Sequence, residues 1–111
     1  RVLDAVKTVA AVEQIAVHFH DTHGRALANV LTALQHGVAA VDSSAGGLGG
    51  CPYATGASGN LATEDLVSWL SAMGIHTGIE LGTLSDASIF MESVLGHTLP
   101  SRHLQARRAG K

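Results

Sequence analysis

Two short apolar runs separated by a helical stretch constrain the fold of this 111-residue chain more than any other feature. The first run occupies residues 15–19, and leucines and valines recur at helical spacing over residues 25–36. Gly37 ends that stretch, and a second apolar run follows at residues 38–41. A strand, a helix and a strand connected at this length form a βαβ unit, whose parallel strands are joined by a right-handed crossover.

Each predicted strand is followed directly by polar residues, which lie at 20–23 and 42–44. Parallel α/β folds place their active sites at the carboxyl ends of the strands. Two strands cannot close a barrel, and a complete (β/α)8 barrel needs roughly 250 residues. We therefore expect an α/β fold in which residues 1–111 form one partial TIM-barrel domain, the carboxy-terminal portion of the barrel with its closing strands and last helices.

Further helices are expected around this unit. Residues 1–10 have helical spacing of their valines, and a glycine-rich loop follows the second strand at residues 45–60. Thr63 has the character of an N-cap for a helix that ends before Gly74. The apolar face of this helix is predicted to contain Leu66, Trp69, Leu70 and Met73.

The last part of the chain is predicted to contain one more helix, at residues 85–95, which packs through Ile89, Phe90 and Val94. Gly96 and Pro100 are expected to close the ordered part. The basic tail at residues 102–111 is then interpreted as a solvated end.

The distribution of charge and the single cysteine narrow the classes of function. Residues 26–101 contain no lysine or arginine, so we expect no nucleic-acid partner. No apolar run approaches the ~18–20 residues of a membrane-spanning helix, so no membrane partner is expected. Cys51 is the only cysteine, which excludes an internal disulfide and fits the cytoplasm of a bacterium or, as the second choice, a mitochondrial matrix.

His18 and His20 are candidate metal ligands. Alternate residues of a strand point to one face, so a strand here would bring both imidazoles to the same side. Imidazoles suit several transition metals, and added oxygen ligands make a site acceptable to Mg or Mn. A hydrogen-bonded histidine pair inside a barrel is the equal alternative from the residues alone. Asp21 and Thr22 would either orient an imidazole or cap the next helix, and capping is favoured for Thr22.

The stretch at residues 46–54 is the most distinctive in the chain, although its glycines match no nucleotide-binding spacing. Cys51 lies within it and is a candidate acid or base, because a thiol of pKa ~8.5 needs little tuning to exchange protons near neutrality. From the residues alone, a cysteine that only packs under a turn is the favoured alternative. Asn60 offers a hard oxygen ligand for Mg or Mn, and a turn or capping role is equally simple.

Four segments together closely resemble the 3-hydroxy-3-methylglutaryl-CoA lyase family. They are His-Phe-His-Asp-Thr at 18–22, Val-Asp-Ser-Ser at 41–44, Gly-Gly-Cys-Pro-Tyr-Ala at 49–54 and Gly-Ala-Ser-Gly-Asn-Leu-Ala-Thr-Glu-Asp at 56–65. The histidine pair is shared with a wider superfamily of metal-dependent aldolases and acyl-CoA condensing enzymes. The cysteine segment and the stretch after it are specific to the lyase, and the resemblance extends over nearly the whole chain.

The resemblance implies cleavage of 3-hydroxy-3-methylglutaryl-CoA to acetyl-CoA and acetoacetate by a metal-dependent TIM-barrel enzyme. It implies that His18, His20 and Asn60 bind Mg²⁺ or Mn²⁺ and that Cys51 is the catalytic acid or base. The implied partners are an acyl-CoA substrate and, for the full-length enzyme, a second copy in a homodimer. The family also uses an aspartate ligand and an arginine from an Asp-Arg-Glu type motif, which this sequence lacks. We therefore expect a carboxy-terminal fragment that is inactive in isolation.

Two alternatives remain from the sequence. A condensing synthase of the isopropylmalate or homocitrate type shares the histidine pair, although the cysteine segment argues against it. A non-catalytic metal-binding module that keeps half of a barrel belongs to a different class of function.

Overall fold

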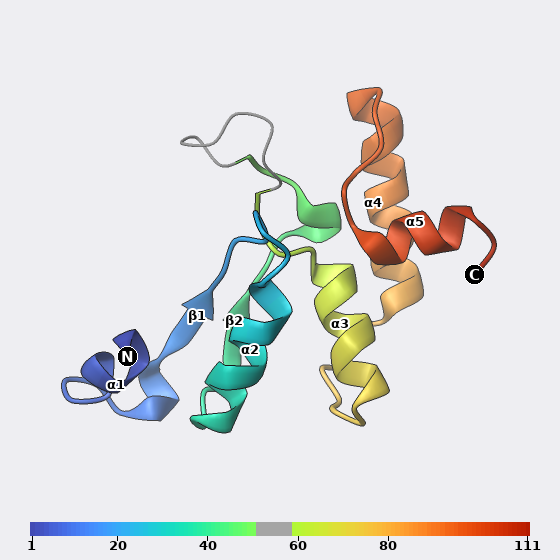
Figure 1. Cartoon of the computed structure of the whole chain (residues 1–111). Coiled ribbons are helices and arrows are strands. Elements are labelled where there is room, and N and C mark those ends of the chain that lie inside the picture. The colour runs from blue at the N-terminus through green and yellow to red at the C-terminus, as the bar shows by residue number, and fades with distance from the viewer. Residues whose placement is uncertain (51–58) are drawn as a thin grey trace.

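The computed structural model of the chain describes residues 1–50 and 59–111. Its elements follow in the order α1 (Val2–Val6), η1 (Val12–Gln14), β1 (Ala16–His18), α2 (Ala26–Gln35), β2 (Ala40–Asp42), η2 (Ala45–Gly47), α3 (Thr63–Ala72), α4 (Leu81–Leu95) and α5 (Arg102–Arg108). The strands and α2 form one side of the molecule, and α3, α4 and α5 form the other (Figure 1). The chain is thus a mixed α/β structure with a two-stranded sheet.

The two strands form the βαβ unit that the sequence predicts. β1 and β2 are parallel, and their register pairs Val17 with Val41 and His18 with Asp42. Helix α2 covers one face of the sheet, where Val30 is fully buried against a cluster that includes Phe19 and Val41. The side chains of alternate residues, including His18 and Asp42, lie on the opposite face and are exposed. The sheet therefore has one apolar face and one face that bears polar groups.

A short extended segment at residues 59–62 connects the ends of both strands. The Asp21 amide donates to the Gly59 carbonyl at 2.9 Å, and the Ser44 amide donates to the Leu61 carbonyl at 2.9 Å. Leu61 is 1% exposed and belongs to the core cluster under α2. This segment therefore brings Asn60 to the carboxyl ends of β1 and β2.

Several helix boundaries differ from the predictions. Helix α1 ends at Val6, well short of the predicted residue 10. The predicted N-cap at Thr63 is wrong, because Ala62 occupies the cap position and Thr63 is the first helical residue of α3. The Thr63 hydroxyl instead shares a 2.7 Å hydrogen bond with Ser43, which ties α3 to the end of β2. On α3, Leu66 and Leu70 are buried as predicted, whereas Met73 is 43% exposed.

The predicted packing of α4 is wrong for Phe90 and Val94, whose side chains are 65% and 62% exposed. The buried residues of this helix are Ser85 and Ser88. Their small side chains allow close approach to neighbouring elements, and each hydroxyl makes a hydrogen bond, Ser85 to the Leu81 carbonyl and Ser88 to a carboxylate of α3. A hydroxyl that makes a hydrogen bond can be buried at little cost in free energy, so these serines form the contact face of α4.

Helix α4 begins at Leu81, earlier than predicted, because Glu80 caps it. The Glu80 carboxylate accepts hydrogen bonds from the Gly82 and Thr83 amides at 3.1 and 2.6 Å. Hydrogen bonds from the Thr83 hydroxyl and amide, and then from the Gly82 amide, lower the pKa of Glu80 below its ordinary 4.5. Gly96, with a φ of +78°, ends the helix as predicted.

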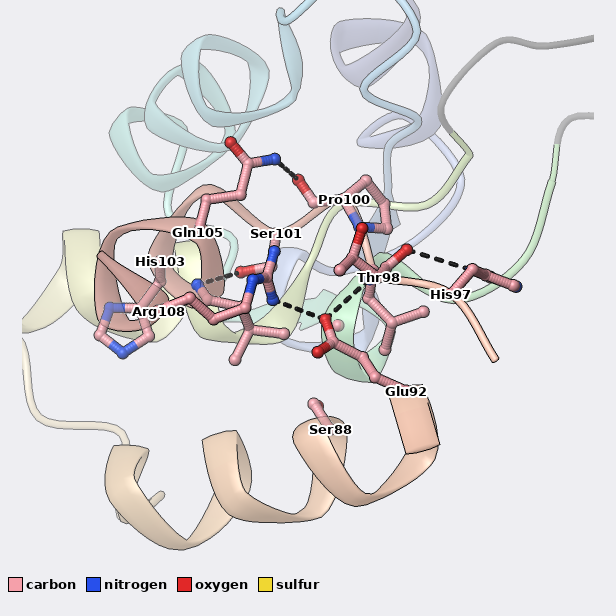
Figure 2. Close-up of polar contacts among 12 residues, drawn as sticks. Ser88, Glu92, His97, Thr98, Pro100, Ser101, His103, Gln105 and Arg108 are labelled. Carbon is pink, nitrogen blue, oxygen red and sulfur yellow. Dashed lines mark hydrogen bonds and ion pairs between the residues drawn. The ribbon is translucent and has the colours of Figure 1, made fainter. Parts of the chain in front are cut away.

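The basic tail is not a solvated end, because residues 102–108 form α5 and Leu104 is fully buried. The Asp65 carboxylate accepts bonds from the Ser101 hydroxyl at 2.7 Å and the His103 amide at 2.9 Å, which fixes the start of α5 to α3. Figure 2 shows Arg108 of α5 reaching Glu92 of α4, at 2.6 Å. These hydrogen bonds connect α5 to α3 and α4, so the tail has a defined position.

The described part of the chain is flat, with extents of 45 × 35 × 19 Å and a radius of gyration of 14.8 Å. A self-contained domain of about this length has a radius of gyration of roughly 13 Å. Among residues 1–50 and 59–111, no helix has the length and apolar character needed to cross a lipid bilayer.

Candidate metal centre

His18 and His20 lie side by side at the carboxyl end of β1. Their ring centroids are 5.2 Å apart and the rings are inclined at 64°. Phe19, between them, packs into the core on the opposite side. The expectation that alternation along a strand brings both imidazoles to one side is confirmed; metal binding by them stays a prediction.

Asn60 lies opposite His20 in an antiparallel bridge. Residues paired in this way have their side chains on the same face with Cβ atoms ~4.5–5.5 Å apart. The Asn60 amide nitrogen donates to the Leu48 carbonyl at 3.0 Å. This bond fixes the direction of the side-chain amide and leaves its oxygen as the atom that can bind a cation.

The turn that supplies the Leu48 carbonyl is anchored by a buried carboxylate. Glu64, in the first turn of α3, is fully buried, and its Oε2 accepts the Gly46 amide at 2.6 Å. Its Oε1 accepts the hydroxyl of Ser88 from α4. Gly46 has a φ of +65°, and a Cβ there would lie 2.4 Å from Leu99 Cδ1, so any larger residue at this position would be strained. Glu64 thus connects the turn beside Asn60 to two helices.

The His18 ring has a polar partner that the sequence analysis did not assign. Its Nδ1 atom lies 2.8 Å from Oδ2 of Asp42, the residue paired with His18 in the sheet. The sequence analysis weighed Asp21 as an imidazole partner or a helix cap, and its Oδ1 accepts the amide of Ala26, the first residue of α2, at 3.0 Å. The contact between His18 and Asp42 depends on the register of the two strands, which sequence periodicity alone does not predict.

The donor set suits a divalent cation. Two imidazole nitrogens with an amide oxygen can hold Mn, and further oxygen ligands make the site suitable for Mg. All three groups are neutral when they act as ligands. Within residues 1–50 and 59–111 no cluster of three or more His, Cys, Asp or Glu side chains could hold a metal.

Cys51, the predicted acid or base, lies outside the described residues, as do residues 52–58 that follow it.

A cavity of about 630 Å³ opens beside Asn60, between the loop after β1 and the start of α5. Its lining includes His23, Gly47, Arg102 and Gln105. The side chain of Arg102 lines this cavity together with the carboxylates of Asp21 and Asp65. Sequence reasoning missed this cation because Arg102 is remote in sequence and reaches the cavity only through the docking of α5.

Comparison with known proteins gives consistent matches over most of the chain. A family model described as HMGL-like matches residues 1–91. The hydroxymethylglutaryl-CoA lyase of Bacillus subtilis is 55% identical over 104 residues, which are 94% of this chain and 35% of that protein.

Two solved structures are also similar. The hydroxymethylglutaryl-CoA lyase from Pseudomonas aeruginosa superposes with a TM-score of 0.95 at 46% identity, over all of this chain and 37% of that one. An HMG-CoA lyase from Acinetobacter baumannii, solved with coenzyme A and 3-methylmalate, gives a TM-score of 0.86 at 44% identity, over 96% of this chain and 35% of that one. The chain spans about a third of the length of these relatives.

Proposed function

The chain belongs to the HMGL-like family, and from this premise we propose that it is part of a divalent-metal-dependent carbon–carbon lyase. The proposed reaction is the cleavage of 3-hydroxy-3-methylglutaryl-CoA to acetyl-CoA and acetoacetate. Because the chain spans about a third of its relatives, the activity is assigned to a longer protein that contains these residues.

The observation that most supports this proposal is the meeting of His18, His20 and Asn60 at the carboxyl ends of two parallel strands. This edge is where parallel α/β enzymes place their catalytic groups. We propose that these three residues hold Mg²⁺ or Mn²⁺, together with a carboxylate from outside the chain.

We further propose that residues 1–111 are the carboxy-terminal part of a (β/α)8 barrel. The exposed polar face of β1 and β2 has the character of a barrel interior, and α2 covers the outer face as barrel helices do. The flat shape fits a piece that packs against further strands. The homodimer implied by the family resemblance belongs to this proposal as well.

Each residue of the site has a distinct proposed role. A bound divalent cation supplies polarisation of the substrate's oxygen atoms and stabilises negative charge. His18, His20 and Asn60 orient the reacting end of the substrate at the strand ends. Arg102, which faces the cavity beside Asn60, meets an anionic group of the acyl-CoA.

Cys51 is proposed as the proton donor. Loss of the proton from the tertiary hydroxyl lets the bond between C2 and C3 break, so that C3 becomes the ketone of acetoacetate. The electron pair of that bond stays on C2, and the Cys51 thiol protonates it to give acetyl-CoA. The hydroxyl proton is released to solvent, and the Cys51 thiolate takes up a proton from solvent to restore the thiol. The protons therefore balance, and the reaction needs no oxidant or reductant.

The decisive experiment is product analysis with the full-length protein and Mn²⁺. We expect equal amounts of acetyl-CoA and acetoacetate from 3-hydroxy-3-methylglutaryl-CoA, and no condensation of acetyl-CoA with 2-oxo acids. Cys51→Ala should lower the rate by ~10²–10⁴-fold while the melting temperature stays near that of the parent protein. Condensation products would favour a synthase, and metal binding without turnover would favour a non-catalytic module.

A further inference from the structure

We propose that Asp42 is a positioning residue for the metal site, which holds the His18 ring through Nδ1 so that Nε2 is the atom offered to the metal. This inference rests on the proposed function, because it assumes that His18 is a ligand. It adds a residue from the second strand to a site otherwise built from the end of β1 and the segment at residues 59–62.

The contact between His18 and Asp42 follows from the pairing of the two strands. His18 and Asp42 are register partners in adjacent parallel strands, so their side chains leave the sheet on the same face. Oδ2 of Asp42 lies 2.8 Å from Nδ1 of His18, within the range of a strong hydrogen bond. The His18 and Asp42 side chains are 46% and 67% exposed, so their contact contributes little to the free energy of folding. A role in function is therefore the better explanation of the pair.

The physical effect of this bond is on the tautomer of the ring. A neutral imidazole has one N–H and one lone pair, and a carboxylate can only accept a hydrogen bond. With Asp42 at Nδ1, the proton is held at Nδ1 and the lone pair is left on Nε2. Carboxylates act in this way on metal-binding histidines, fixing the direction of the ring and raising the basicity of the ligand.

Two alternative roles for Asp42 fit the structure less well. As a direct ligand it would form a three-residue cluster with the two histidines, but no such cluster able to hold a metal is present in the described part of the chain. A chance surface pair is exemplified by His36 and Asp4, whose atoms are 3.8 Å apart, beyond hydrogen-bond distance. The contact at His18 is a full ångström shorter, and it lies next to the second histidine.

The first test measures metal affinity, independently of turnover. In the full-length protein, Asp42→Ala should raise the dissociation constant for Mn²⁺ by about 10–100-fold in calorimetry. Asp42→Asn should give a smaller increase, because an amide oxygen still accepts a hydrogen bond but has no charge. Asp4→Ala is the matched control, since Asp4 is 68% exposed and also faces a histidine, and it should leave the affinity unchanged.

The second test observes the tautomer of His18 directly in the metal-free protein by ¹⁵N NMR. The parent should show the proton on Nδ1, and Asp42→Ala should shift the population towards Nε2–H. His18→Ala distinguishes failure of the role of Asp42 from failure of the proposed metal site. If it abolishes Mn²⁺ binding while Asp42→Ala binds as the parent does, the role of Asp42 is refuted and the proposed function stands. If His18→Ala itself binds Mn²⁺ normally, the proposed metal site is wrong.

Discussion

Replacement of Glu64 by alanine should destabilise the protein severely, although Glu64 is a charged residue. Its side chain is fully buried and accepts hydrogen bonds from the Gly46 amide and the Ser88 hydroxyl. The substitution leaves two buried donors without an acceptor, at a cost of ~1–3 kcal/mol each, or ~2–6 kcal/mol together. Total folding free energies are typically ~5–15 kcal/mol, so the loss would be a large part of the stability.

Urea unfolding followed by the fluorescence of Trp69 tests this estimate. Trp69 is the single tryptophan of the chain, and it packs against the cluster that contains Leu66 and Leu70 of the same helix. Glu13→Ala is the control, because Glu13 is exposed, and its effect should stay within ~0.5 kcal/mol. Equal effects of Glu64→Ala and Glu13→Ala would refute the role of Glu64 as an anchor.

Three further predictions concern the cap of α4, the turn at Asn60 and the cavity. The lowered pKa of Glu80 means that its cap stabilises α4 above pH 4.5 and that this contribution is lost as the pH falls through the lowered pKa. The protection factors for hydrogen exchange at the start of α4 should therefore fall in acid in the parent protein, and should be low at every pH in Glu80→Ala. In Gly49→Ala the new Cβ would lie 2.8 Å from the Asn60 amide nitrogen at a φ of +98°, so Mn²⁺ affinity should fall several-fold; unchanged calorimetry would count against the role of Asn60. Arg102→Gln should raise KM for the acyl-CoA by roughly tenfold with little change in kcat, as expected for loss of one charged contact of ~1.5 kcal/mol, whereas Lys111→Gln should leave both constants unchanged.

The sequence predicted the features that depend on local periodicity. Alternation of apolar and polar residues placed His18 and His20 on one side of a strand, and the helical repeat with Gly37 located α2 within a residue at each end. These predictions succeeded because each depends on residues that are neighbours in the chain.

Features that depend on contacts between distant residues were not predicted. The docking of α5 requires Asp65, which lies 36 residues before Ser101, and the burial of Ser85 and Ser88 requires their neighbours in space. The partnership of Asp42 with His18 requires the register of two strands. Local patterns contain none of this information, so the tail was assigned to solvent and α4 was given an apolar contact face.

The central claim is that His18 and His20 bind one divalent cation, and pulsed electron paramagnetic resonance of the full-length protein with Mn²⁺ tests it most directly. We predict ¹⁴N couplings from two imidazoles in the parent protein. His18→Ala and His20→Ala should each lose one of these couplings, because each variant removes one nitrogen ligand. A parent spectrum without imidazole couplings, or one that neither substitution changes, would contradict the account.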